Sequence, residues 1–241
     1  FLRAEIPLDF RESVGDRVEF ISLILNQNRA IVDGKRVEID WADFRTGRIY
    51  PYTSAALAPG RYDCRAVFRN LDDGRAAVGS CSVDVAALPA DGPIVFPPLF
   101  FVRGQDSRFL NLVSQKDKGV ADGPSISGIF PFPAKEFVPL VGSLRQGASE
   151  LWGTLKCIWR GARVGEIELT FRLTPEGGEE EVPIPAEILD ASSRDDADFC
   201  FVRFELPELP PGRYRLEILA GEAGTGPVVR TEGWFTVRPP E

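Results

Sequence analysis

The four cysteines are residues whose chemistry depends directly on their spacing. Cys64 and Cys81 are placed symmetrically about the polar turn 72–73. In an antiparallel hairpin with that turn, their side chains lie directly opposite each other, at a separation that a disulfide can bridge. Cys157 and Cys200 form the second candidate pair, in two further predicted strands. We therefore expect two disulfides and an oxidising compartment, with four buried free thiols as the alternative.

An acidic cluster near residue 194 offers oxygen ligands. Its members are Asp190, Asp195, Asp196 and Asp198. Carboxylates gathered on a loop can bind Ca²⁺, which commonly rigidifies extracellular β-modules. The spacing is not that of an EF-hand and Arg194 lies inside the cluster. The competing interpretation is therefore a solvated acidic loop, and no resident metal is expected.

Three aromatic side chains are candidates for binding a ligand: Trp152, Trp234 and Phe20. Trp152 and Phe20 lie on the strand faces opposite runs of apolar residues, and Trp234 alternates with inward-facing apolar residues. An exposed aromatic ring can stack on a sugar or anchor a partner protein. The competing interpretation is that these rings pack under the connection between two modules or under the stretch 94–113.

Several kinds of catalytic site are excluded by composition. The chain has no histidine, which excludes a Ser-His-Asp triad, a Cys-His dyad and any zinc site that needs histidine. Neither of the glycine-rich phosphate-binding motifs occurs. The 36 acidic residues are too many for spacing alone to select a catalytic carboxylate pair. We expect a protein that is not an enzyme and needs no cofactor, with a carboxylate-based hydrolase as a minor alternative.

Charge and hydropathy limit the partners. The net charge of −8 argues against nucleic acid, which would require a basic surface. The most apolar stretch, 93–102, is too short to span a bilayer. The sequence begins at Phe1 without an initiator methionine or signal peptide, so we expect it to be a piece of a longer protein.

The elements that position these residues are predicted to be β-strands. After Pro59-Gly60, apolar and polar side chains alternate as far as residue 69, and they alternate again in 79–85 after a polar turn. This period of two predicts a β-hairpin. The entry sequence Leu57–Tyr62, LAPGRY, returns as Leu209–Tyr214, LPPGRY, 152 positions later. The chain is therefore predicted to contain two copies of one β-module.

Other strands are predicted on both sides of this hairpin. They include 4–10 and 17–26, and Asp33-Gly34 indicates a hairpin between 29–32 and 35–41. In the second copy, 150–159 matches 17–26, with Trp152 in the place of Phe20. The offset is 132 positions there and 152 at the Pro-Gly corner. About twenty extra residues are therefore expected within 165–201, as an added hairpin.

These patterns predict an all-β fold of two tandem antiparallel β-sandwiches. The first module is assigned to 1–87, a linker to 88–93, and the second module to 94–241. The second module contains extra N-terminal strands and the added hairpin. Phe100 or Phe101 is expected to be buried, because 94–102 is too apolar for a free connector.

The repeated corner has a mechanical interpretation. It resembles the tyrosine corner of immunoglobulin-like and fibronectin type III sandwiches, in which a tyrosine hydrogen-bonds back to the preceding turn. Tyr62 and Tyr214 are therefore interpreted as structural. Together with Pro131-Phe132 and Phe137-Val138-Pro139, the corners resemble the tandem β-sandwich region of secreted bacterial proteins related to the von Willebrand factor A domain. The resemblance implies a periplasmic or extracellular location, but the Asp-x-Ser-x-Ser signature of the A domain does not occur.

The function expected from the sequence is that of a non-catalytic interaction or spacer module of a secreted or periplasmic bacterial protein. Its partner would be another protein or a further domain of the same chain. The alternative is a carbohydrate-binding module that uses outward-facing tryptophans.

Overall fold

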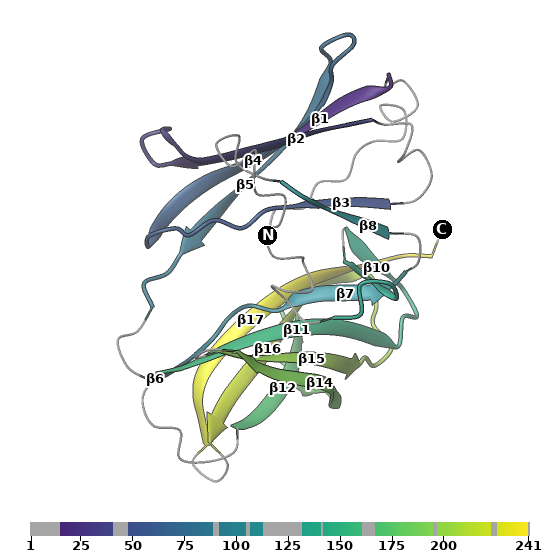
Figure 1. The fold of residues 1–241 in the computed structure, drawn as a ribbon. Coiled ribbons are helices and arrows are strands. Elements are labelled where there is room, and N and C mark those ends of the chain that lie inside the picture. Colours follow the sequence, from purple (N-terminus) through teal and green to yellow (C-terminus); the bar gives the residue numbers. More distant parts are fainter. Residues whose placement is uncertain are drawn as a thin grey trace. The chain divides into compact units, whose positions relative to one another are not determined.

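All regular secondary structure in the described part of the chain is β-strand. The computed structural model describes residues 15–40, 48–88, 92–104, 107–112, 132–140, 142–160, 167–194, 197–222 and 226–240. Two compact units are present (Figure 1): Phe1–Leu88 with Asp106–Ile129, and Pro89–Gln105 with Phe130–Glu241. The predicted all-β class is confirmed.

The first unit contains a four-stranded antiparallel sheet of order β2-β1-β4-β5 and a separate parallel pair, β3 with β8. The strands are β1 (Arg17–Asn26), β2 (Ile31–Asp40), β3 (Arg48–Tyr52), β4 (Gly60–Asn70), β5 (Ala76–Val85) and β8 (Ser107–Asn111). Strand β8 was assigned to the second module from its position in the sequence. The structure places it in the first unit, because its backbone pairs with β3 and the adjoining Leu112 enters the first unit's core.

Two small clusters form the core of the first unit. One contains Val18, Phe20, Phe68 and Leu112, with the rings of Phe20 and Phe68 4.8 Å apart. The other contains Ile24, Tyr62 and Cys64. Even-numbered residues of β1 therefore supply the apolar contacts of these clusters, as expected for a strand whose successive side chains alternate between faces.

The hairpin predicted at Asp33-Gly34 is wrong. Strand β2 runs without interruption through these residues, and the chain turns instead at residues 27–30. There the backbone amides of Asn28 and Ala30 both donate to Asn26 Oδ1, each at 3.0 Å, and Arg29 has a φ of 61°. The side chain of Asn26 thus satisfies the turn's donors, which favours reversal at this point over Asp33-Gly34.

The second unit contains two sheets. One has the order β10-β17-β16-β12-β13, and the other has the order β14-β15-β11-β7-β9 with β6 paired to β11. The strands are β6 (Gly92–Val95), β7 (Leu99–Arg103), β9 (Phe137–Pro139), β10 (Ser143–Arg145), β11 (Glu150–Arg160), β12 (Ile167–Pro175), β13 (Val182–Pro183), β14 (Ala186–Arg194), β15 (Ala197–Glu205), β16 (Gly212–Glu222) and β17 (Gly226–Arg238).

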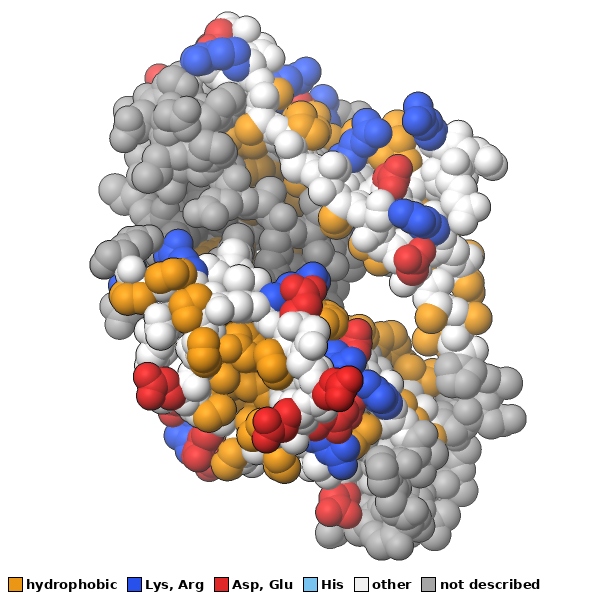
Figure 2. All heavy atoms as spheres, turned by 180° about the vertical axis from the view of Figure 1, so that it is seen from behind, with side chains coloured by type: hydrophobic (Ala, Val, Ile, Leu, Met, Phe, Trp, Pro, Cys, Tyr) orange, Lys and Arg blue, Asp and Glu red, His pale blue; other side chains and the backbone are white. Residues whose placement is uncertain are grey.

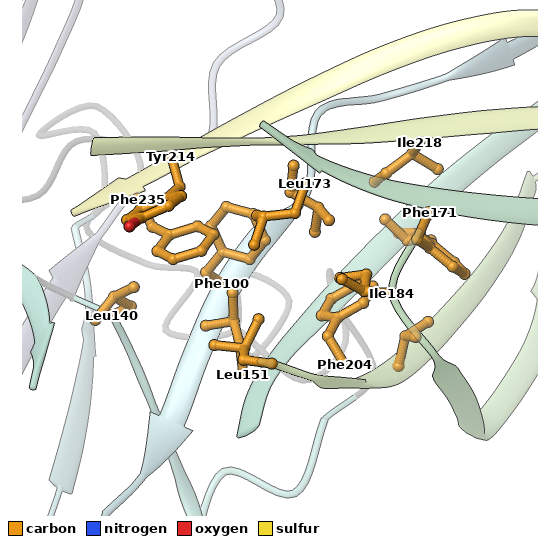
Figure 3. Packing of buried hydrophobic residues seen from close by; sticks show 14 of the residues in the cluster. Phe100, Leu140, Leu151, Phe171, Leu173, Ile184, Phe204, Tyr214, Ile218 and Phe235 are labelled. Atoms are coloured by element: carbon orange, nitrogen blue, oxygen red, sulfur yellow. The ribbon is translucent and has the colours of Figure 1, made fainter. Parts of the chain in front are cut away.

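Side chains from both sheets meet in one core (Figure 3). Leu151 and Phe204 come from one sheet, and Ile218 and Phe235 come from the other. Phe100 of β7 joins them, because its ring stands edge-on to Phe204 and Phe235, with centroids 6.5 and 5.8 Å away. Phe100 is 2% exposed, which confirms that the apolar segment around it is buried.

Both repeated corners form the expected hydrogen bond. The hydroxyl of Tyr62 donates to the carbonyl of Ala58, and that of Tyr214 donates to the carbonyl of Pro210, each at 2.8 Å. Each corner leads into a strand that forms a hairpin with the next one, β4 with β5 and β16 with β17. The structural role assigned to the two tyrosines agrees with this geometry.

The repeat extends further than the corner, but in a different alignment from the one predicted. The strand beside the corner strand is β1 in the first unit, where Asn26 lies opposite Tyr62. In the second unit it is β12, where Pro175 lies opposite Tyr214. The predicted match of β1 with β11 is therefore wrong, because β11 belongs to the other sheet. The orders β2-β1-β4-β5 and β13-β12-β16-β17 correspond strand by strand.

Replacement of Tyr214 by phenylalanine is expected to remove the corner hydrogen bond and to lower the free energy of unfolding by about 1 kcal/mol. Burial also raises the pKa of the Tyr214 hydroxyl, so the folded state favours the protonated form. This contribution is complete below pH about 10, the pKa of an exposed tyrosine, and is lost as pH rises through the folded-state pKa. Urea unfolding from pH 7 to 11 measures both effects. An unchanged free energy of unfolding at pH 7 would contradict the structural role.

Candidate functional site

Trp234 is exposed on the outer face of the sheet β10-β17-β16-β12-β13. Its neighbours in β17, Gly233 and Phe235, are buried, whereas Trp234 is 38% exposed. Successive side chains of a strand point to opposite faces, so Trp234 points away from the core. This is the orientation expected from the sequence.

Two charged residues hold the indole ring of Trp234 in place. The guanidinium carbon of Arg213 lies 4.6 Å from the ring centroid, which is a cation–π contact. The indole Nε1 donates to Glu232 Oε1 at 3.1 Å. The ring therefore has a contact on its face and another at its polar edge, and less side-chain freedom remains to be lost when a partner binds.

A network of ion pairs extends from Trp234 across three strands. Arg213 Nη1 lies 2.9 Å from Glu176, and the two guanidinium nitrogens of Arg215 lie 3.9 Å from Glu181 and from Glu232. Arg172 Nη1 is 2.8 Å from Glu181. We call this surface the Trp234 face, and its members are Trp234, Arg172, Arg213, Arg215, Glu176, Glu181 and Glu232.

The Trp234 face is electrically balanced, since three arginines face three glutamates. Its ion pairs are partly exposed, so each adds little to stability. Their effect is to fix long side chains around the indole and to leave no strong field of one sign. The carboxylates of this face each lie next to a guanidinium, so none stands as an isolated pair of acids of the kind a hydrolase would use.

The backbone beneath Trp234 is tightly supported. A Cβ atom at Gly233 would lie 2.5 Å from Pro98 Cγ and 2.7 Å from Phe100 Cζ. Only glycine lets the backbone of β17 approach these rings so closely. The same packing that buries Phe100 therefore fixes the strand that carries Trp234.

The other two aromatic candidates are not available for binding. Trp152 is 5% exposed, and its ring lies 5.2 Å from that of Phe137 and 5.2 Å from the guanidinium carbon of Arg103. Phe20 is also 5% exposed and packs with Phe68 in the first unit's core. The exposure that would make them binding residues is not observed, because β7, β9 and Leu112 cover those faces. The competing interpretation, packing under the stretch 94–113, agrees with the structure.

No disulfide joins the four cysteines, all of which lie in described strands. Cys64 and Cys81 are directly opposite each other, in the predicted register, with Cys64 buried and Cys81 exposed. Burial, and then the neighbouring Cys81 thiol, raise the pKa of Cys64. Cys157 lies opposite Asp198 rather than Cys200, so the second pair is out of register. The prediction of disulfides is therefore wrong, and the argument for an oxidising compartment that was based on them no longer holds.

The acidic cluster is only partly described. Asp190 is exposed in β14, and Asp198 in β15 accepts a hydrogen bond from Ser193 Oγ at 2.5 Å. Asp195 and Asp196 lie outside the described residues. Within the described part of the chain, no three histidine, cysteine or acidic side chains gather into a group that could hold a metal ion.

The charged partners of Trp234 were not identified from the sequence. Glu232 lies two residues before Trp234, which places both side chains on one face of the strand. Arg213 belongs to the repeated corner motif itself. The two-residue period of a strand could therefore have identified Glu232 as a neighbour of Trp234. The approach of Arg213 could not be predicted in this way, because it depends on the register between β16 and β17, which places Arg215 opposite Trp234.

Charge is mixed over the rest of the visible surface. On the described part of the face shown in Figure 2, acidic and basic side chains are interspersed with apolar ones. Among the described residues, no helix has the length and apolar character needed to cross a membrane.

The matches between this chain and known proteins come from solved structures. No protein-family model and no curated protein sequence matches the chain. Among solved structures, the chain is similar to a family 123 glycoside hydrolase from Clostridium perfringens, studied for glycolipid glycan hydrolysis, with 10% identity and a TM-score of 0.28. The match covers 39% of this chain and 21% of that enzyme, so the chain corresponds to about a fifth of the hydrolase. A likeness of this degree carries no argument about the fold or function of this chain.

Proposed function

We propose that the chain is a non-catalytic interaction or spacer module that binds another protein, or a further domain of its own protein, through the Trp234 face. The observation that supports this most directly is Trp234 itself, an exposed ring held by Arg213 and Glu232. Tryptophan and arginine are enriched among the residues that dominate binding energy at protein interfaces. Because the ring is already fixed, less side-chain entropy is lost on binding.

We further infer that each unit is a sandwich of the immunoglobulin or fibronectin III type. Three features support this: the tyrosine corner, the hairpin that follows it, and the shared strand order of β2-β1-β4-β5 and β13-β12-β16-β17. Such sandwiches have many functions, so the fold alone does not identify the partner. The resemblance to secreted bacterial proteins supports a periplasmic or extracellular location.

Loss of partner binding on removal of the Trp234 ring tests this proposal. Trp234→Ala is expected to weaken binding about thirtyfold or more, which corresponds to an interface anchor worth at least about 2 kcal/mol. The matched control is Leu189→Ala, because Leu189 is 44% exposed and lies in β14 of the other sheet. Proteins from a bacterial envelope extract would be captured on wild type and both variants, and quantified by mass spectrometry. Equal capture by all three proteins would show that the Trp234 face is not the binding surface.

Carbohydrate binding is the second candidate, and the surroundings of Trp234 favour it specifically. An indole ring flanked by carboxylates and guanidinium groups can stack on a sugar and hydrogen-bond to its hydroxyls. A glycan array probed with wild type and Trp234→Ala separates the two candidates. Saccharide binding that is lost in Trp234→Ala and kept in Leu189→Ala would establish the carbohydrate function in place of the first.

A further inference from the structure

Strand β5 forms an outer edge of the four-stranded sheet in the first unit (Figure 1). It pairs with β4 over ten consecutive residue pairs, from Gly60 opposite Val85 to Arg69 opposite Ala76, without a shift in register. No described strand pairs with its other side. Its outward backbone amides and carbonyls therefore form a straight, regular row of the kind that accepts another strand.

The other strands that end the three larger sheets carry features that discourage strand pairing, and β5 does not. Strands β2 and β14 both contain a register shift next to charged residues. Strands β9, β10 and β13 have only two or three residues, and β9 and β13 contain a proline. Strand β5, AAVGSCSVDV, has no proline, no bulge and one charged residue, Asp84. Proteins usually block edge strands with these devices, so their absence marks β5 as a pairing surface.

Both faces of β5 are accessible. Val78 is 64% exposed on one face, and Cys81 and Val83 are exposed on the other, with Val83 at 38%. Valine on an accessible strand favours packing against a neighbouring strand over contact with water. An incoming strand would therefore cover apolar side chains on both faces while it pairs with the backbone.

We propose that β5 pairs with β5 of a second copy of this chain, antiparallel, so that two four-stranded sheets become one continuous sheet. The charge of β5 supports this occupant. Pairing centred on Cys81 puts Asp84 opposite Val78 and Ser80 opposite Ser82, all on one face, so the two aspartates do not meet. Because the surface is the same on both copies, this contact closes as a two-fold symmetric dimer. The proposal is independent of the Trp234 face.

A lysine in the centre of this edge tests the proposal. Cys81→Lys would place two ammonium groups directly opposite each other on the dimer axis, and it is expected to raise the dimer dissociation constant at least tenfold. The matched control is Ile31→Lys, because Ile31 is 62% exposed on β2, the opposite edge of the same sheet, and should leave the constant unchanged. Sedimentation equilibrium of the full chain measures the constant for all three proteins. Wild-type protein that stays monomeric up to about 0.1 mM, or equal constants for all three, would overturn the proposal.

Thiol cross-linking gives a second readout, which requires no charged substitution in β5. Cys81 is exposed and lies on the proposed axis, whereas Cys64 is buried. In a Cys64→Ser background, a short bismaleimide is expected to join two copies through Cys81, and Cys81→Ser should abolish this product. Absence of a Cys81-dependent dimer under conditions where sedimentation detects association would place the contact elsewhere and reject the β5 pairing.

Discussion

Arg69→Met is expected to lower the free energy of unfolding by about 3 kcal/mol. Glu19 is fully buried, and its two carboxylate oxygens face Arg69 Nη2 at 2.6 Å and Arg36 Nη1 at 2.9 Å. Loss of one partner from a buried ion pair costs about 3–5 kcal/mol, because a charge is left buried without compensation. The lower end of this range applies because Arg36 remains beside Glu19. Urea unfolding of wild type and variant measures the difference.

Two further variants test whether the loss of stability comes from the broken ion pair with Glu19 or from the removal of any arginine. Arg65→Met changes an exposed arginine on the same face of β4 and is expected to alter stability by less than about 0.5 kcal/mol. In the Arg69→Met background, Glu19→Gln should recover part of the loss because it removes the buried charge. Equal effects of Arg69→Met and Arg65→Met would show that the pair with Glu19 contributes nothing.

Phe100→Ala is expected to lower the free energy of unfolding by about 3–5 kcal/mol. The ring is 2% exposed and contacts rings from both sheets of the second unit, so its removal leaves a cavity between them. Phe100→Leu, which fills most of the same space, should cost much less. Hydrogen exchange measured by mass spectrometry should show faster exchange in β7, β11 and β17 and unchanged exchange in β1 and β4. Uniform acceleration in both units would contradict the assignment of Phe100 to the second unit's core.

The features that the sequence predicted correctly depend on residues close together in the chain. The hairpin of β4 and β5 follows from alternation and a polar turn, and its register places Cys64 opposite Cys81 as expected. The tyrosine corners follow from the six-residue motif that contains Tyr62 and, in its second copy, Tyr214. In each case the turn chemistry and the strand period agree, so local sequence was sufficient.

The features that the sequence left open depend on contacts between distant parts of the chain. Phe20 is covered by Leu112, which lies more than ninety positions away in the sequence. Trp152 is covered by Phe137 and Arg103, which come from β9 and β7. Periodicity assigns each ring to a face of its strand but does not show what covers that face. Periodicity also assigned Trp234 to an outward face, and the ring is exposed there because no described strand covers that face.

The path of the chain between the two units affects how the protein can be synthesised and rearranged. Strand β8 emerges from the ribosome after β6 and β7, although it pairs with β3. At about 5–20 residues per second, the nascent first unit waits about 1–4 s between the completion of β5 and the start of β8. During that interval Phe20 and Phe68 lack the contact with Leu112. A recombination event that divides the gene between β5 and β6 would separate β3 from its partner strand, so the first unit cannot be exchanged between proteins as a contiguous cassette.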